Sequence, residues 1–326
     1  MKKKIDLRIA LLIAAGLCVI GGIVMICTWN QWKKTETVCN IPDRPAIYDR
    51  CGNLLIGNHQ RTNQPNECLR YAAVDGKFAA AFLGWTEFQD GRERGRTGIE
   101  AFIDSNHVAS PVYVSLDSGV QQKMELLAEH LNAAGKCNYL YAVCIDSNGE
   151  LIATAQRDVL DINNRKHTVG TCFFSANYLF PVAGKFLQFL TDPAAVSPES
   201  ISKLQLTEKT GCFSPEVQGR IKFADSKYTV SATAFKYLLA YISVIEKKPV
   251  PQLKIFSDGK QNPVVITEPE VKWIVDAPGD EIIAALTEIS TENNGSLYVF
   301  VCIGVDKKDP DNREKIKTAI SEKLSF

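Results

Sequence analysis

The chain has 326 residues, of which 45% are hydrophobic and 23% are charged. This composition is typical of a globular protein with a substantial core, and it excludes a disordered chain. The 37 lysines and arginines balance 37 aspartates and glutamates, and no basic stripe is interleaved with aromatic residues. Nucleic acid is therefore excluded as a partner.

An uncharged apolar segment near the N-terminus predicts a membrane anchor. Residues 9–29 form a run of about 21 residues, long enough to cross a ~30 Å hydrocarbon core as a helix. A cleaved signal peptide is the alternative, but residues 28–30 (Thr-Trp-Asn) do not form the small-residue site that cleavage requires. Basic residues are denser before the run than after it, so residues 1–8 are predicted to be cytoplasmic and the bulk of the chain extracytoplasmic. These basic residues are Lys2, Lys3, Lys4 and Arg8 before the run, and Lys33 and Lys34 after it.

Ten cysteines are many for a cytosolic protein. Cys18 and Cys27 lie in the apolar run, and the remaining eight allow up to four disulfides in an oxidising compartment. Unpaired, buried thiols are the alternative. No Cys-x-x-Cys pair occurs and the histidines are scattered, so neither a metal ion nor a cofactor is predicted. The four histidines are His59, His107, His130 and His167.

Beyond residue 110, hydrophobic periodicity predicts a mixture of helices and strands. In chain order, the patterns predict a strand over residues 111–116, a helix over 119–134, strands over 139–146 and 151–155, helices over 181–190, 233–246 and 280–290, a strand over 296–305 and a helix over 311–323. The dipeptide Asn148-Gly149 is a strong signal for a β-hairpin. Helices grouped between hairpin strands favour an α+β fold with a central antiparallel sheet.

The segment from Arg44 to Leu55 resembles the sequence that opens the ectodomain of class B penicillin-binding proteins. Its residues are Arg-Pro-Ala-Ile-Tyr-Asp-Arg-Cys-Gly-Asn-Leu-Leu, and the family signature is Arg-Gly-x-Ile-x-Asp-Arg-Asn-Gly-x-x-Leu. In that family, too, the signature follows a short cytoplasmic tail and one membrane span. On physical grounds alone, Asp49 to Asn53 forms a turn between two β-rich runs.

Four further blocks follow in the order in which the family carries them. Residues 82–85 and 95–100 resemble its Gly-aromatic and Gly-x-x-Gly-x-Glu segments, residues 114–121 resemble the start of its transpeptidase domain, and residues 142–153 resemble its first hairpin. The resemblance implies an ectodomain in two parts. Residues 30–110 would be a linker and a dimerisation-like pedestal, and residues 111–326 a shortened penicillin-binding/β-lactamase-like transpeptidase domain with an antiparallel sheet between helices.

The segment that resembles the family's active-site motif differs from that motif at the nucleophile. Penicillin-binding proteins acylate a serine three residues before a lysine on a helix, and class B members carry it as Tyr-x-Pro-Gly-Ser-Thr-Phe-Lys. The aligned residues 178–185 are Tyr-Leu-Phe-Pro-Val-Ala-Gly-Lys, so Val182 stands at the serine position and Lys185 matches the lysine. Valine has no nucleophilic atom, so the resemblance implies that no catalytic set is intact. Lys185 is predicted to be a solvated or hydrogen-bonded lysine rather than a retained base.

Other short strings share letters with the family motifs. Residues 200–203 and 257–260 have the Ser-x-x-Lys spacing, but the first serine is predicted at a helix start and the second in an Asp-Gly turn. Residues 209–211 (Lys-Thr-Gly) precede the helix predicted over 233–246, whereas the catalytic Lys-Thr-Gly of the family follows that helix. They resemble a structural segment of the family instead. Residues 175–177 (Ser-Ala-Asn) lie on the wrong side of the motif lysine to be its Ser-x-Asn element.

These patterns favour a non-catalytic penicillin-binding-protein homologue in a bacterial cytoplasmic membrane, acting through protein contacts in peptidoglycan synthesis or cell division. The resemblance implies a polytopic peptidoglycan glycosyltransferase or divisome proteins as partners. Three alternatives stay open: an active D,D-transpeptidase with another nucleophile, a sensor that binds cell-wall peptides without reacting, and a secreted α+β domain of unrelated function. The sequence also leaves open whether a cleft binds peptide or β-lactam.

Overall fold

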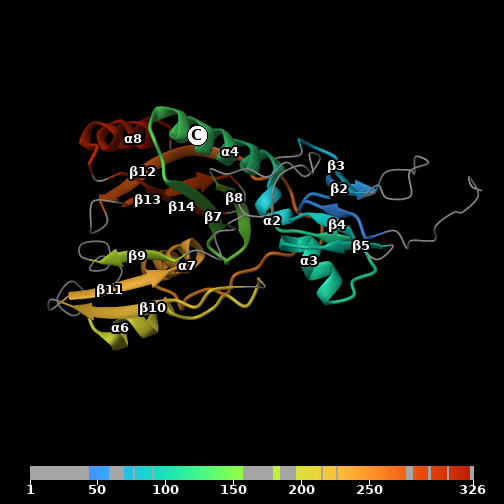
Figure 1. Cartoon of the computed structure of the whole chain (residues 1–326), viewed down its shortest axis with the longest axis horizontal. Helices are drawn as coiled ribbons and strands as arrows, with labels where there is room; N and C mark the ends of the chain where they lie inside the picture. Colours follow the sequence, from blue (N-terminus) through green and yellow to red (C-terminus); the bar gives the residue numbers. More distant parts are fainter. Residues whose placement is uncertain are drawn as a thin grey trace, which may run out of the picture. The chain divides into compact units, whose positions relative to one another are not determined.

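The computed structural model describes residues 44–58, 70–75, 78–89, 92–156, 179–183, 196–213, 216–224, 227–276, 282–292, 295–306 and 308–323. All of them belong to one compact unit, which comprises Arg44–His59 and Cys68–Phe326 (Figure 1). The predicted anchor and linker lie outside the described residues. Within the described residues, no helix combines the length and the hydropathy needed to cross a membrane.

A five-stranded antiparallel sheet forms the centre of this unit. Its strand order is β12-β13-β14-β7-β8, so that β14 pairs with β7, which is distant in the sequence. The predicted central sheet, the predicted hairpin and the strand predicted over residues 296–305 are confirmed. The strands are β7 (Tyr139–Asp146), β8 (Leu151–Gln156), β12 (Ile266–Asp276), β13 (Ile282–Thr291) and β14 (Ser296–Gly304).

Asp146 and Gly149 hold the turn between β7 and β8. The Asp146 Oδ1 atom accepts hydrogen bonds from the backbone N–H groups of Asn148 at 2.9 Å and Glu150 at 2.8 Å. Gly149 has a φ of +85°, and a Cβ atom there would come within 2.2 Å of the Gln252 carbonyl oxygen. The turn therefore requires glycine at this position, which is why the Asn-Gly signal predicts it correctly.

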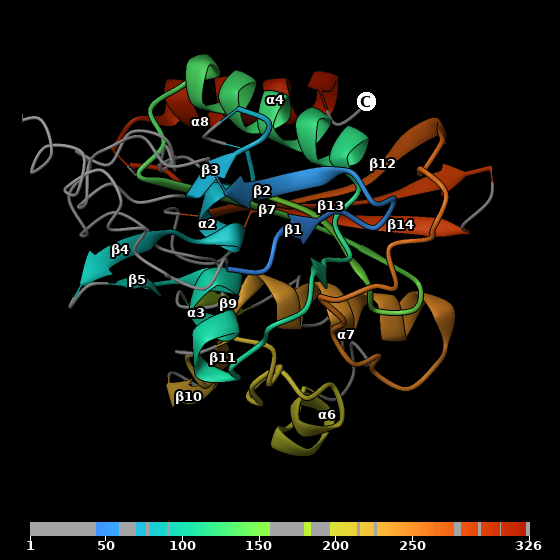
Figure 2. The same cartoon turned by 90° about the vertical axis from the view of Figure 1, so that its right-hand side faces the viewer.

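Helices cover both faces of the central sheet (Figures 1 and 2). Helices α4 (Ser118–Ala134) and α8 (Pro310–Lys323) cover one face, and α7 (Ala234–Glu246) covers the other. Odd-numbered side chains of residues 141–145 pack in the core that contains α7, and even-numbered side chains of residues 140–144 pack in the core that contains α4 and α8. Because both faces of β7 are buried, its sequence is apolar throughout rather than alternating. The sequence patterns predict all three helices at these positions.

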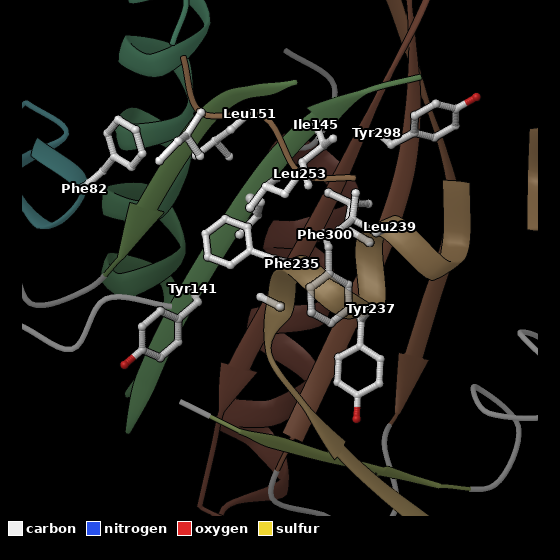
Figure 3. Close-up of a cluster of buried hydrophobic side chains, with 14 of the residues drawn as sticks. Phe82, Tyr141, Ile145, Leu151, Phe235, Tyr237, Leu239, Leu253, Tyr298 and Phe300 are labelled. Atoms are coloured by element: carbon white, nitrogen blue, oxygen red, sulfur yellow. The ribbon is translucent and has the colours of Figure 1, made fainter. Parts of the chain in front are cut away.

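Helix α7 contributes Phe235, Tyr237 and Leu239 to a cluster of buried hydrophobic side chains (Figure 3). Every residue from Ala234 to Ile242 is buried, which explains why the helix is apolar on all sides. The Thr233 side chain caps its N-terminus by accepting a hydrogen bond from the Lys236 backbone N–H. The Tyr237 hydroxyl donates to the Val230 carbonyl oxygen at 2.7 Å, so the helix is also tied to a neighbouring strand.

A second sheet of four short strands, ordered β3-β2-β1-β6, lies in the N-terminal part of the unit. Strands β1 and β6 are parallel, with Ile47 opposite Val112. β6 is shorter than the strand predicted over 111–116, because Val114 makes only an isolated bridge, to Phe256. The predicted domain boundary after residue 110 stays a prediction. The elements of this part are β1 (Ile47–Tyr48), β2 (Leu54–Asn58), β3 (Arg70–Ala72), α2 (Ala80–Leu83), β4 (Thr86–Gln89), β5 (Arg92–Gly95), α3 (Gly98–Ser105) and β6 (Val112–Tyr113).

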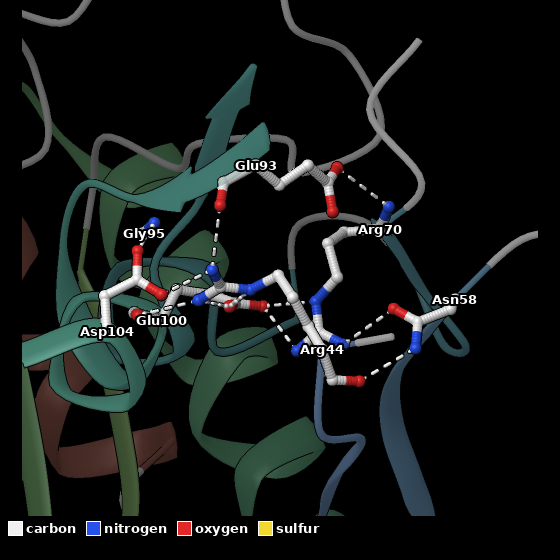
Figure 4. A network of polar contacts seen from close by, with 7 residues as sticks. All are labelled: Arg44, Asn58, Arg70, Glu93, Gly95, Glu100 and Asp104. Atoms are coloured by element: carbon white, nitrogen blue, oxygen red, sulfur yellow. Dashed lines mark hydrogen bonds and ion pairs between the residues drawn. The ribbon is translucent and has the colours of Figure 1, made fainter. Parts of the chain in front are cut away.

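A buried network of ion pairs joins the start of the described chain to α3 (Figure 4). Glu100 is 1% exposed, and its carboxylate pairs with Arg44 at 2.9 Å and with Arg70 at 2.7 Å. Arg44 also contacts Asp104 at 2.5 Å and donates to the Glu93 carbonyl oxygen at 3.2 Å. Arg44 and Glu100 come from two of the sequence blocks that resemble the penicillin-binding-protein pedestal. Two blocks far apart in the sequence therefore meet in one contact.

Two predicted helices are strands in the structure. Residues 282–291 form β13 rather than part of a helix over 280–290, because an apolar run buried on both faces of a sheet has no helical period. Residues 180–183 form strand β9 (Phe180–Ala183) rather than the start of a helix over 181–190. β9 is an edge strand, where Pro181 is tolerated because its missing N–H is not needed for pairing. It belongs to a third sheet, ordered β10-β11-β9, with β10 (Arg220–Ala224) and β11 (Lys227–Ala232).

The five cysteines among the described residues form no disulfide, which corrects the prediction of up to four disulfides for this part of the chain. Cys144 and Cys302 are buried in the central sheet, and burial raises the pKa of each thiol. Both therefore behave as small apolar core side chains. Cys39, Cys68 and Cys172 lie outside the described residues.

Replacing Glu100 with alanine is expected to destabilise the fold strongly, because Arg44 and Arg70 would lose their buried counter-charge. Removing one partner of a buried ion pair costs about 3–5 kcal/mol. Urea unfolding should show a loss of this order in the free energy of unfolding. The matched control is Glu87→Ala, which removes a half-exposed partner of Arg96 and should cost less than ~1 kcal/mol. Equal losses in the two variants would contradict the role given to the network.

Candidate functional site

The segment that aligns with the nucleophile motif is described only in part. Val182 lies in β9, where the backbone is extended and pairs with Val230 of β11. Tyr178 and Lys185 lie outside the described residues. The family motif places a hydroxyl and an amine one turn apart on a helix, and residues 180–183 do not form that geometry. At the position that the resemblance gives to the nucleophile, the structure has a valine in a β-strand.

Ser200 has a structural role at the start of helix α6 (Pro198–Lys203). It forms a capping box with Ser197, in which each side chain accepts a hydrogen bond from the other residue's backbone N–H, at 2.9 and 3.1 Å. Lys203 pairs with Glu199 at 3.2 Å, and both side chains are largely exposed. The helix start that the sequence predicts here is confirmed.

Ser257 lies in the predicted turn. Its hydroxyl donates to the Val114 carbonyl oxygen at 3.2 Å and accepts a hydrogen bond from the Gly259 backbone N–H at 3.2 Å. Gly259 has a φ of +71°, which a side chain would strain. The hydroxyl thus joins two chain segments and holds the turn.

The Lys-Thr-Gly sequence at residues 209–211 forms a loop around Glu216. The backbone N–H groups of Thr210 and Gly211 donate to the Glu216 carboxylate at 2.6 and 2.9 Å. Glu216 is 7% exposed, so these bonds satisfy a carboxylate that has little access to water. This is the structural role that the sequence predicts for the segment.

Strand β12 occupies the place in the fold where the resembled family carries its catalytic Lys-Thr-Gly. It is the first strand after α7, and it lies at the edge of the central sheet. Its sequence is Ile-Thr-Glu-Pro-Glu-Val-Lys-Trp-Ile-Val-Asp. This strand contains no Lys-Thr-Gly sequence.

Lys236 is a buried cation that the sequence analysis missed, although it is the only lysine inside the apolar run from Ala234 to Glu246. Its residue is 5% exposed. Burial lowers the pKa of its amine, and the charges of Glu208 and Glu216 oppose that shift. A lysine of this kind is a candidate base or nucleophile. Among the described residues, no side-chain hydroxyl is bonded to its amine.

A small cavity of about 80 Å³ lies between α2, α4 and the end of β8. Glu125 lines it, and its Oε1 atom accepts hydrogen bonds from the Ala79 backbone N–H at 2.6 Å and from Gln121 Nε2 at 2.8 Å. Burial raises the pKa of the Glu125 carboxyl, the two hydrogen bonds oppose this, and the charges of Asp75 and Glu129 add to it. No local sequence pattern predicts the cavity, because its walls come from three separate segments.

Comparison with known proteins gives a fold but no close relative. The chain matches no protein-family model and no curated protein sequence. Crystal structures of penicillin binding protein 3 from Mycobacterium tuberculosis are similar to it, in the apo form and in complexes with aztreonam and ampicillin. Each has a TM-score of 0.53, with 13% sequence identity for the apo form and 12% for the complexes. The match covers 86% of this chain and 95–96% of those chains.

The similarity to these structures defines the class of fold. The chain has a penicillin-binding-protein fold, with an antiparallel sheet between helical layers. This confirms the predicted α+β fold with an antiparallel sheet between helices, while the class B subtype and the division into two parts stay predictions. At 12–13% identity the likeness concerns the fold alone.

Glu125→Gln is expected to stabilise the protein at neutral pH. A carboxyl whose pKa is raised in the folded state contributes stability below its unfolded pKa, and this contribution is lost as the pH rises through the folded pKa. Glutamine keeps an acceptor for the Ala79 and Gln121 hydrogen bonds and carries no charge. The melting temperature of the variant should therefore exceed that of the wild type at pH 7, and the gap should close toward pH 4.

The control is Glu292→Gln, which changes an exposed carboxyl outside the cavity. The melting temperature of this control should stay close to that of the wild type across the same pH range. A Glu125→Gln variant that is less stable than the wild type at pH 7 and at pH 4 alike would show that the carboxylate is needed for its hydrogen bonds.

Proposed function

We propose that this chain is a non-catalytic homologue of class B penicillin-binding proteins, anchored in a bacterial cytoplasmic membrane, that works through protein contacts in peptidoglycan synthesis or cell division. One observation carries the proposal. The penicillin-binding-protein fold is present, and Val182 stands where the resembled motif has its serine. Fold alone does not establish function, so the argument rests on the chemistry of that position.

Acyl transfer by the route of the family needs a hydroxyl that a neighbouring base can activate. The valine side chain contains only carbon and hydrogen, so no acyl-enzyme can form at Val182. The two serines with Ser-x-x-Lys spacing support the same conclusion, because their hydroxyls are used in structure. Ser200 closes a capping box and Ser257 holds a turn against Val114.

The anchoring part of the proposal comes from the sequence. Residues 9–29 would span the membrane, with residues 1–8 in the cytoplasm and the folded unit outside. The resemblance implies a polytopic peptidoglycan glycosyltransferase or divisome proteins as partners.

Fluorescent penicillin tests the proposal on the full chain in detergent, beside an active penicillin-binding protein. The expected result is no covalent band from the folded chain under conditions that label the active protein fully, because no activated serine is present. Circular dichroism before and after incubation establishes that the unlabelled chain is folded.

A stable band mapped to a serine by mass spectrometry would contradict the proposal. Variants Ser200→Ala and Ser257→Ala would then show whether either serine carries the label. Loss of the band in one of them would identify an active D,D-transpeptidase with a different nucleophile.

A further inference from the structure

Strand β10 has an open edge. It is the outer strand of the three-stranded sheet, paired with β11 on one side and with no other described strand on its far side. All five of its residues, Arg220–Ala224, are exposed. An unpaired edge presents backbone N–H and C=O groups to solvent, and it is a template for pairing with another chain.

One face of β10 is apolar and exposed to solvent, although it lies beside a buried residue of β11. Ile221 lies opposite Val230, and Phe223 lies opposite Tyr228, with the two aromatic rings 4.7 Å apart. Val230 is fully buried, whereas Ile221 is 39% and Phe223 61% exposed. Phe223 is the most exposed large hydrophobic side chain among the described residues. A further strand beside β10 would cover this face.

The other face of β10 carries two cations. Arg220 and Lys222 alternate with the apolar residues, and neither forms an ion pair or a side-chain hydrogen bond within the described part of the chain. The whole chain has 37 basic and 37 acidic residues, so two unpaired cations on one short strand are a local excess of positive charge.

We infer that the β10 edge binds an extended segment of a partner protein in which acidic and apolar side chains alternate. The segment would add a fourth strand through backbone hydrogen bonds. Its acidic side chains would lie beside Arg220 and Lys222, and its apolar side chains beside Ile221 and Phe223. The inference gives the chemistry of a partner for the contact role proposed above. The inference rests on the proposed contact role. Its test does not use penicillin labelling, so the two proposals can fail separately.

Other occupants fit the edge less well. A second copy paired antiparallel would place Lys222 opposite itself, opposite Arg220 or opposite Ala224, and none of these registers gives either cation an acidic neighbour. A polyanion or an anionic lipid surface would attract the two cations, but neither offers a backbone ladder for the edge. Only a peptide strand satisfies the backbone, the charges and the apolar face together.

The test uses a capped heptapeptide of alternating glutamate and valine with a fluorescent label, titrated with the full chain in detergent. Fluorescence anisotropy should show saturable binding, and hydrogen exchange should show slower exchange of amides in residues 220–224. The double variant Arg220→Glu, Lys222→Glu should bind about tenfold more weakly or worse, because attraction becomes repulsion. The matched control, Lys123→Glu with Lys315→Glu, makes the same change in net charge at exposed positions on α4 and α8 and should bind as the wild type does.

Four results would overturn the inference. The first is no saturable binding up to about 1 mM peptide. The second is equal affinity in the two double variants, which would mean that the cations of β10 are not used. The third is binding without protection of residues 220–224. The fourth is a dimer in the absence of peptide in which the amides of residues 220–224 are protected. The last outcome would make a second copy of the chain the occupant.

Discussion

Strand β7 is buried on both faces, and it pairs with a strand from the C-terminal part of the described chain. Its hydrogen-bond partners are β8, which follows it directly, and β14, which comes near the C-terminus. On one face it packs in the core of α7 and on the other in the core of α4 and α8. Neither core can close until β14 has paired with β7. The fold is therefore cooperative across most of the described sequence.

This constraint explains how a scaffold can persist while a reactive centre is lost. The elements that bury apolar surface, such as α7 and β14, hold the structure together, whereas a nucleophile in a cleft contributes little to stability and often costs some. A β-branched residue such as Val182 suits a strand better than a reactive hydroxyl does. In the account proposed here, the geometry of acylation has been replaced by strand pairing with Val230, and the protein keeps its fold for contacts with other proteins.

The parts of the fold that could be predicted are those with strong local signals. Helix α4 has an amphipathic period, helix α7 ends at a Lys-Lys-Pro sequence, and the turn at Gly149 has the Asn-Gly pair. β13 was wrongly predicted as a helix because its buried apolar run, like that of any strand covered on both faces, lacks a period of two.

The features of the site that could not be predicted depend on contacts between distant segments. The cavity beside Glu125 needs α2 and β8 to reach α4, and no local pattern reports that meeting. The exposure of Phe223 depends on which side of β10 the sheet leaves open, and an apolar residue in a strand is by default expected in the core. The ion pair between Arg44 and Glu100 could not be predicted for the same reason, although both residues lie in sequence blocks that resemble the family.

The most direct test of this account restores the missing hydroxyl. The measurement is the intact mass of the full chain with Val182→Ser after incubation with a β-lactam. The account predicts an unchanged mass, because residue 182 lies in a strand paired with Val230 and not on a helix one turn from a lysine. A gain of one β-lactam, mapped to residue 182, would contradict the claim that strand pairing has replaced the acylation geometry. That result would mean that the acylation geometry survives and that only the serine has been lost.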